Sequence, residues 1–198
     1  MKKKLLSLLF TLLFGCAFAQ SSDLLRYNQN RLKTTKVAMT VLGTWAVGNL
    51  AVGSVLSTKK EGADKYFHQM NALWNGVNLG IAGFAYYRAS STDPALFDLY
   101  ATFNEQQKLQ KILLFNAGLD VGYMAGGLYL REKGKNTVDP KKSMQRKGWG
   151  KSIILQGAFL FVFDLSTYFV FAGKNEELRE ILRGLSFSGN GVGWRMVF

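Results

Sequence analysis

The sequence predicts an all-α membrane protein built as a bundle of four transmembrane helices. Of its 198 residues, 48% are hydrophobic, and four apolar stretches of about twenty residues each match the length a helix needs to cross roughly 30 Å of hydrocarbon. Each stretch also has an amide or a carboxylate near its middle, so these polar residues are the candidates for function. The predicted spans are residues 37–57, 68–87, 112–130 and 152–172.

Residues 1–19 have the pattern of a secretory signal peptide. Lysines at 2–4 precede a short apolar run, and the small residues Ala17 and Ala19 form a cleavage signal. Cleavage there removes Cys16, the only cysteine, and leaves no disulfide, thiolate nucleophile or cysteine metal site. An alternative interpretation is a lipoprotein cleavage box in which Cys16 carries the lipid.

The net charge of +12 is concentrated in one connection. Residues 131–151, between the last two spans, hold eight cations and only two acids, which is the pattern of a cytoplasmic loop that contacts anionic headgroups. No recognition motif accompanies this stretch, so nucleic-acid binding is not expected. The predicted headgroup contacts are Lys141, Lys142, Arg146 and Lys147.

Alternation of the spans then places both termini outside the bacterial inner membrane. The 20–36 segment and the 173–198 tail are predicted to be periplasmic, although three cations before the first span oppose that orientation. Within the tail, residues 174–183 predict a short polar helix, and residues 185–198 alternate like a strand, with residues 188–191 as a turn.

Two aspartate–proline pairs predict helix starts between the spans. Asp93 is expected to begin an amphipathic helix that lies on the outer surface and runs into the third span. Asp139 is expected to begin the fourth helix, which Gly148 and Gly150 should loosen before the membrane.

An eight-stranded outer-membrane β-barrel is the alternative fold. The mature length suits it, residues 113–129 alternate in polarity, and the chain ends in the aromatic Phe198. The helical bundle is preferred because the first two apolar stretches lack a two-residue period and residues 96–111 favour a helix.

Glycines at four-residue spacing predict where the helices pack closely, because small residues let two backbones approach. Packing within one bundle is preferred to a dimer interface. The residues are Gly76, Gly80, Gly118, Gly122 and Gly126.

Polar residues inside the spans form the candidate site. At a rise of about 1.5 Å per residue, most of them fall near the membrane midplane and can meet in one layer. A buried carboxylate needs a partner, water or a proton, so both aspartates should face the bundle interior. The predicted cluster consists of Asn49, Asn71, Asn75, Asn78, Asn116, Asp120, Gln156 and Asp164.

Two functions are compatible with this cluster. The preferred one is a structural or scaffold subunit, in a homo- or hetero-oligomer, whose polar side chains hold the helices in register. The alternative is a small proton- or cation-coupled transport component that uses Asp120 and Asp164. Enzyme motifs are absent from the sequence, and no cofactor or metal is predicted.

Several short segments carry a family resemblance. They are Tyr66-Phe67-His68-Gln69-Met70-Asn71, Trp74-Asn75, Asn78, Leu155-Gln156-Gly157 and Phe163-Asp164. Together they resemble an uncharacterised family of small multi-pass membrane proteins of Bacteroidota. The resemblance implies a membrane location and assigns no catalytic residue.

Overall fold

Four long helices make up most of the chain. The computed structural model describes the backbone of residues 2–183, 185–188 and 191–194, and the side chains of residues 22–182. The long helices are α1 (Lys2–Lys59), α2 (Gly62–Ser91), α3 (Leu99–Lys135) and α4 (Pro140–Ala172); shorter elements are η1 (Pro94–Leu96), α5 (Asn175–Arg183), β1 (Leu185–Ser188) and β2 (Gly191–Trp194). This architecture supports the all-α prediction, and the eight-stranded barrel is wrong.

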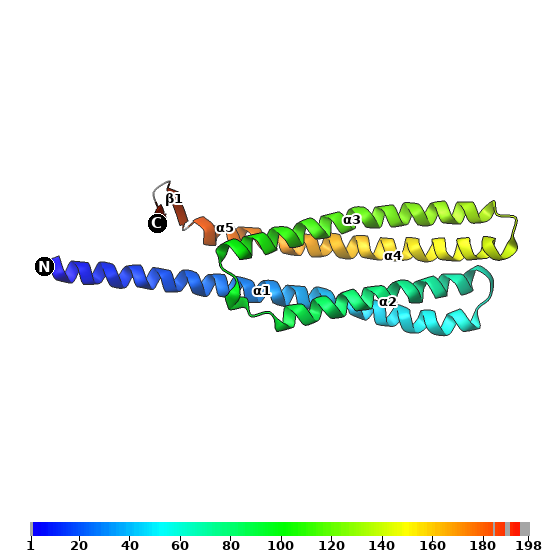
Figure 1. The fold of residues 1–198 in the computed structure, drawn as a ribbon, viewed down its shortest axis with the longest axis horizontal. Coiled ribbons are helices and arrows are strands. Elements are labelled where there is room, and N and C mark those ends of the chain that lie inside the picture. Colours follow the sequence, from blue (N-terminus) through cyan, green and yellow to red (C-terminus); the bar gives the residue numbers. More distant parts are fainter. Residues whose placement is uncertain (1, 184, 189–190, 195–198) are drawn as a thin grey trace.

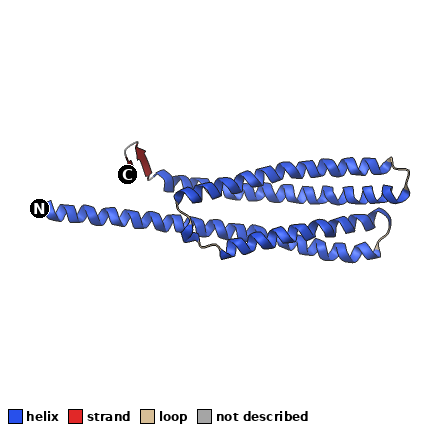
Figure 2. Cartoon of the chain, in the orientation of Figure 1, coloured by secondary structure: helices blue, strands red, loops and turns tan. Residues whose placement is uncertain are grey.

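The long helices form two antiparallel hairpins that lie side by side (Figures 1 and 2). Helices α1 and α2 make one hairpin, α3 and α4 make the other, and the two hairpins meet mainly along α2 and α4. Both hairpin turns lie at one end of the bundle, which we call the turn end (Figure 1). The termini and η1 lie at the opposite end, which we call the terminal end.

Aspartate caps explain where α3 and α4 begin. Asp139 accepts hydrogen bonds from the amides of Lys141 (2.9 Å) and Lys142 (3.1 Å), and these bonds lower the pKa of its carboxyl. The predicted start of α4 is therefore confirmed. Asp93 caps only the 3₁₀ turn η1, whereas Asp98 accepts from the amide of Ala101 at 2.7 Å and starts α3. The predicted helix start at Asp93 is wrong because this second aspartate caps a separate helix.

The basic stretch 131–151 is mostly helical. Helix α3 continues to Lys135 and α4 starts at Pro140, so only residues 136–139 connect them. Helix α4 is also unbroken at Gly148 and Gly150, and the expected loosening there is wrong. Both glycines lie against neighbouring backbone, which holds this part of the helix in place.

The C-terminal elements agree with the predicted polar helix and strand-like alternation. Helix α5 follows α4, and β1 pairs with β2 in antiparallel fashion, with Leu185 opposite Trp194. Gly189 and Asn190, the centre of the predicted turn, lie outside the described residues.

The bundle is polar inside and apolar outside. Its most buried side chains include Asn75 and Gln156, both 0% exposed, whereas Leu73 and Phe115 are each 68% exposed. Two helical segments of the described chain, Ser22–Lys59 and Pro140–Leu182, are long and apolar enough to cross a membrane. The predicted second and third spans are not in these two segments.

Candidate functional site: two polar layers between the helices

The first polar layer is a closed ring of hydrogen bonds that joins α1, α2 and α4. Trp45 Nε1 donates to Gln156 Oε1 (3.1 Å), and Gln156 Nε2 donates to Asn71 Oδ1. Asn71 Nδ2 then donates to Asn49 Oδ1 (2.9 Å), and Asn49 Nδ2 donates back to the carbonyl oxygen of Trp45 (2.9 Å). We call these four residues the amide ring.

Each side chain of the amide ring has a partner, which suits a structural role. Buried polar groups that bond one another across helices stabilise a membrane bundle by about 0.6 to 1.7 kcal/mol per contact. Sequence reasoning predicted three members of the ring and missed Trp45. Its indole N–H is the donor that closes the ring, and its side chain stacks on Phe159 with 3.9 Å between ring centroids.

The second layer is a cavity of about 200 Å³ lined by α1, α2, α3 and α4, which we call the carboxylate pocket. Four of the predicted polar residues line it: Asn78, Asn116, Asp120 and Asp164. In its lining, Trp74 of α2 meets Tyr123 of α3 edge to face, with 5.0 Å between ring centroids. Sequence reasoning placed the predicted polar residues in a single layer, whereas the structure divides them between two.

Asp120 and Asp164 are buried together in this pocket. Asp120 is 2% exposed and Asp164 is 6% exposed, and both side chains line the same cavity. Two ionised carboxylates in one buried cavity repel each other, which favours a state in which they share a proton or bind a cation. None of the salt bridges among the described side chains involves either aspartate.

Several polar atoms near the pair have no partner, in contrast to the amide ring. Asp120 Oδ2, Asn78 Nδ2 and Asn75 Oδ1 are all buried without a hydrogen bond in the described structure. Such groups cost about 1 to 3 kcal/mol each unless a ligand or water satisfies them. Asn75 lies between the layers, since its Nδ2 donates to the carbonyl oxygen of Asn71 at 2.8 Å. The pocket thus has the chemistry to hold a proton, a small cation or a hydrogen-bonding ligand.

Close backbone contact between α3 and α4 positions the two aspartates. A Cβ added to Gly157 would lie 3.0 Å from the carbonyl oxygen of Asp120, so only glycine lets the helices approach this closely. Asp164 follows Gly157 by seven residues, two helical turns, and therefore lies on the same face of α4. Among residues 22–182, no group of three or more His, Cys, Asp or Glu side chains could hold a metal ion.

The five glycines predicted for packing have open space beside them in the described structure. A Cβ added to any of them would have nothing within 4 Å. The tight contacts belong to other glycines, which the four-residue spacing did not reveal. These are Gly53, Gly127, Gly134, Gly148, Gly150 and Gly157.

The cations predicted to bind headgroups lie at the turn end but differ in their surroundings. Lys141 and Lys142 are exposed in the first turn of α4. Arg146 Nη1 donates to Thr137 Oγ1 at 2.7 Å, and Lys147 lies against Gly134. Lys142 also pairs with Asp139 at 3.8 Å, but this salt bridge is exposed. Lys141 and Lys142 can therefore reach a surface, while the other two side chains hold the α3–α4 connection.

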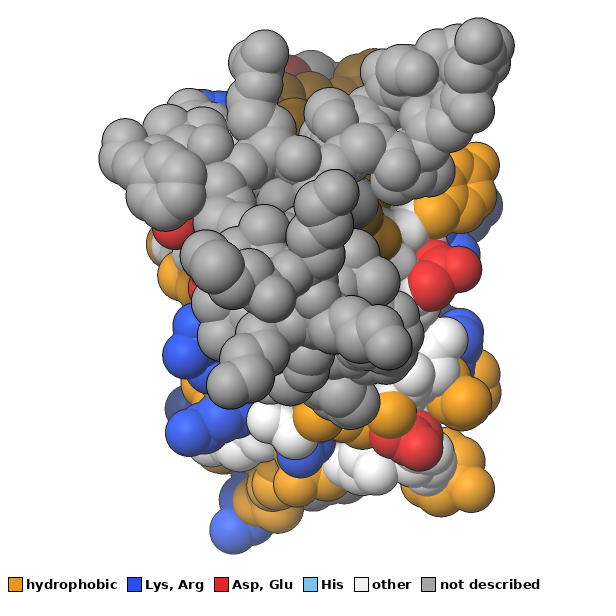
Figure 3. Space-filling view, turned by 90° about the vertical axis from the view of Figure 1, so that its left-hand side faces the viewer, with side chains coloured by type: hydrophobic (Ala, Val, Ile, Leu, Met, Phe, Trp, Pro, Cys, Tyr) orange, Lys and Arg blue, Asp and Glu red, His pale blue; other side chains and the backbone are white. Residues whose placement is uncertain are grey.

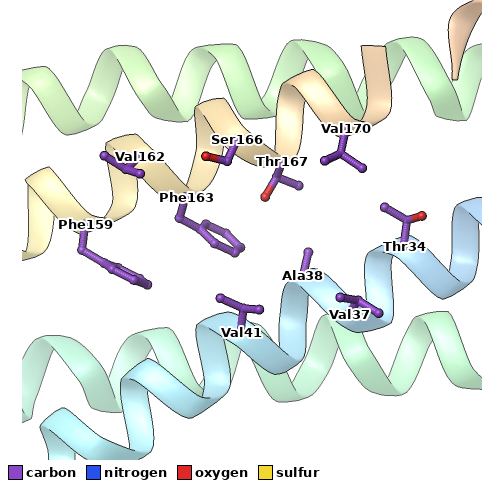
Figure 4. Close-up of a pocket in the computed structure, with 10 residues that line it drawn as sticks. All are labelled: Thr34, Val37, Ala38, Val41, Phe159, Val162, Phe163, Ser166, Thr167 and Val170. Atoms are coloured by element: carbon purple, nitrogen blue, oxygen red, sulfur yellow. The ribbon is translucent and has the colours of Figure 1, made fainter. Parts of the chain in front are cut away.

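An apolar groove runs along α1 and α4 (Figure 4). Its volume is about 350 Å³, and its walls include Val37 and Val41 from α1 and Phe159, Val162 and Val170 from α4. The groove contains no charged side chain. It offers contact area without a group that would select a polar ligand.

Comparison with known proteins identifies a family but no activity. The Family of unknown function (DUF6992) matches residues 41–165, a range that contains both polar layers. No curated protein and no solved structure matches the chain. The match agrees with the expected resemblance to a family without established activity, and the chain belongs to this family of unknown function, DUF6992.

Proposed function

We propose that this protein is an integral membrane protein whose carboxylate pocket binds and releases a proton or small cation as part of transport. The observation that carries the proposal is the unpartnered Asp120 Oδ2, buried beside Asp164 and Asn78. The proposal is supported by the contrast with the amide ring, in which each side chain on these helices has a hydrogen-bond partner. An unsatisfied carboxylate pair nearby is better explained by a ligand that comes and goes.

The distribution of side chains supports a membrane location with four spans. Even the shortest long helix, α2 with 30 residues, measures about 45 Å and exceeds the thickness of the hydrocarbon layer. Exposed valine, leucine and phenylalanine side chains on all four helices suit contact with lipid. If the predicted signal peptide is cleaved, cations are in larger excess at the turn end than at the terminal end, which favours a cytoplasmic turn end in the inner membrane. There Lys141 and Lys142 would contact anionic headgroups.

A reporter fusion tests this topology. A reporter inserted within residues 136–139 should report the cytoplasm, and one placed after Phe198 should report the periplasm. The reason is the excess of lysine and arginine around the α3–α4 connection. If both positions lie on the same side of the membrane, the four-span arrangement is wrong.

Ion flux measured with the Asp164→Asn variant tests the proposed transport function. This change keeps the size and hydrogen bonding of the side chain but removes its titratable group, so flux of the coupled ion should fall to background while the protein stays folded. The measurement is flux of H⁺, Na⁺ and K⁺ in proteoliposomes, with thermal unfolding followed in parallel. Asp23→Asn is the matched control, because Asp23 pairs with Arg26 on the surface of α1. Lack of flux for all three ions in folded wild-type protein would overturn the proposal.

A scaffold subunit is the second candidate. It is favoured by the amide ring, which ties three helices together, and by the outward glycine row Gly118, Gly122 and Gly126, which leaves space for a helix of another chain. A stable complex with a second chain, together with absence of ion flux, would favour this role over transport.

A further inference from the structure

A second charged cavity lies at the terminal end of the bundle, far along the helices from the turn end. Its volume is about 230 Å³, and α1, α2 and α3 each contribute one cation to its lining: Arg31, Arg88 and Lys108. Figure 3 views this end of the bundle and shows Lys and Arg side chains beside hydrophobic ones around the edge of the bundle. We call this cavity the cationic pocket.

Arg31 is a buried charge that makes no described salt bridge, although Glu105 lies near enough to act on it electrostatically. The residue is 3% exposed, and its Nε and Nη2 donate to Asn28 Oδ1 at 3.3 and 3.0 Å. The guanidinium lies 4.5 Å from the centre of the Phe97 ring, and Arg31 forms no salt bridge within the described part of the chain. Asn28 is itself held by α3, since its Nδ2 donates to Thr102 Oγ1 at 2.8 Å. The guanidinium is therefore fixed in place, and burying such a charge is costly unless an anion approaches it.

Glu105 is the acidic side chain in the lining, and it does not neutralise all three cations. Glu105 faces the pocket, and its salt bridge to Lys108 is long, at 3.9 Å, and solvent-exposed. Arg88 is exposed and, like Arg31, takes part in no described salt bridge. Three cations against one carboxylate give the pocket a net charge suited to an anion.

The lining also changes from charged to apolar in one direction. On each helix the cation lies nearer the terminal end, and the apolar side chains lie nearer the middle of the bundle. Phe84 precedes Arg88 by one turn on α2, and Ile112 follows Lys108 by one turn on α3. Phe84 is 66% exposed and Ile112 is 45% exposed, so the apolar part is open to the surroundings of the bundle. The pocket therefore suits a molecule with an anionic head and an apolar tail.

We propose that the cationic pocket binds the phosphate group of a membrane phospholipid, with the acyl chains lying along Phe84 and Ile112. Guanidinium groups bind phosphate oxygens through paired hydrogen bonds, and Arg31 and Arg88 both face the cavity. This proposal rests on the same membrane location as the proposed transport function, but it does not require Asp120 or Asp164 to bind an ion. It concerns the terminal end of the bundle and is separate from headgroup contact by Lys141 and Lys142.

Lipid titration of the detergent-purified protein tests this assignment. Phosphatidylglycerol, an uncharged diacylglycerol and inorganic phosphate are titrated separately, and stabilisation against thermal unfolding reports binding. Phosphatidylglycerol should stabilise wild-type protein, while the other two should have little effect. At roughly fivefold per cation, Arg88→Gln/Lys108→Gln should weaken the apparent affinity for phosphatidylglycerol about 25-fold. Both side chains are exposed, so this variant should fold.

A matched variant controls for the loss of charge. Lys33→Gln/Lys111→Gln also removes two exposed cations near the same end, but neither residue lines the pocket. Its affinity for phosphatidylglycerol should remain within about twofold of wild type, since long-range screening weakens distant charges. Equal losses of affinity for phosphatidylglycerol in the two variants would overturn the assignment of the lipid site to the cationic pocket. Stabilisation by inorganic phosphate as strong as that by phosphatidylglycerol would overturn the lipid assignment. Absence of ion flux in the proteoliposome test would leave the lipid assignment unaffected.

Discussion

Replacing Gly148 with alanine should lower the free energy of unfolding by about 3 kcal/mol, because overpacking against a rigid neighbour costs this much. The added Cβ would meet the carbonyl oxygen of Ala63 and would lie 2.7 Å from the backbone nitrogen of Phe67. Both atoms belong to the backbone of α2 and cannot rotate away. The clash falls where α2 and α4 join the two hairpins, so the hairpins must separate to accommodate a single methyl group.

Gly122→Ala is the matched control for this prediction. Nothing lies within 4 Å of a Cβ at Gly122, and alanine favours a helix over glycine by roughly 0.5 to 1 kcal/mol. This variant should be as stable as wild type or slightly more so. Thermal unfolding in detergent, followed by circular dichroism, measures both changes. A similar loss in the two variants would show that the α2–α4 contact does not depend on close packing at Gly148.

The contrast between these two glycines explains which part of the fold could be predicted from the sequence. Apolar stretches predicted the four helices, and Asp139 with Pro140 predicted the start of α4, because both signals are local in the sequence. The outward row that includes Gly118 and Gly122 has the spacing of a packing motif, yet spacing alone does not say which face of a helix meets its neighbour. That choice depends on the arrangement of all four helices.

A seven-residue repeat of buried positions, most of them small or polar, would have located the contacts between helices better than the four-residue glycine spacing. On α4, buried residues recur at Ser143, Gly150, Gly157, Asp164 and Phe171, and on α3 they recur at Gln106, Leu113, Asp120, Gly127 and Gly134. Such a period is typical of helices that pack at a shallow angle. A search for hydrophobic periodicity misses it, because this bundle buries polar and small side chains and exposes large apolar ones.

The candidate site was predictable in composition but not in organisation. Burial of the amides and of both aspartates follows from the cost of exposing them to hydrocarbon. The division between a satisfied ring and an unsatisfied pocket does not follow from depth in the membrane. It depends on Gln156 reaching Asn71 and on Trp45 supplying a donor from α1, and these are contacts between side chains far apart in the sequence.

Asn71→Leu should lower the free energy of unfolding by about 1 to 3 kcal/mol, since interhelical hydrogen bonds of this type contribute roughly 0.6 to 1.7 kcal/mol each. Asn71 is the junction of the amide ring, where it accepts from Gln156 and donates to Asn49. Leucine removes both bonds and leaves Gln156 Nε2 and Asn49 Oδ1 without these partners. Asn116→Leu is the control: Asn116 lines the carboxylate pocket without a described hydrogen bond, so its replacement should change stability by less than about 0.5 kcal/mol.

A double-mutant cycle with Gln156 decides whether the ring acts as one unit. If it does, Asn71→Leu/Gln156→Leu should cost less than the sum of the two single changes, because the second substitution removes a group that the first has already left unpaired. Unfolding of all three variants in the same detergent gives the coupling energy. Additive losses would mean that Asn71 and Gln156 stabilise the helices independently. A loss in Asn116→Leu equal to that in Asn71→Leu would instead give the carboxylate pocket a structural role. It would weaken the distinction between the two layers on which the proposed transport function depends.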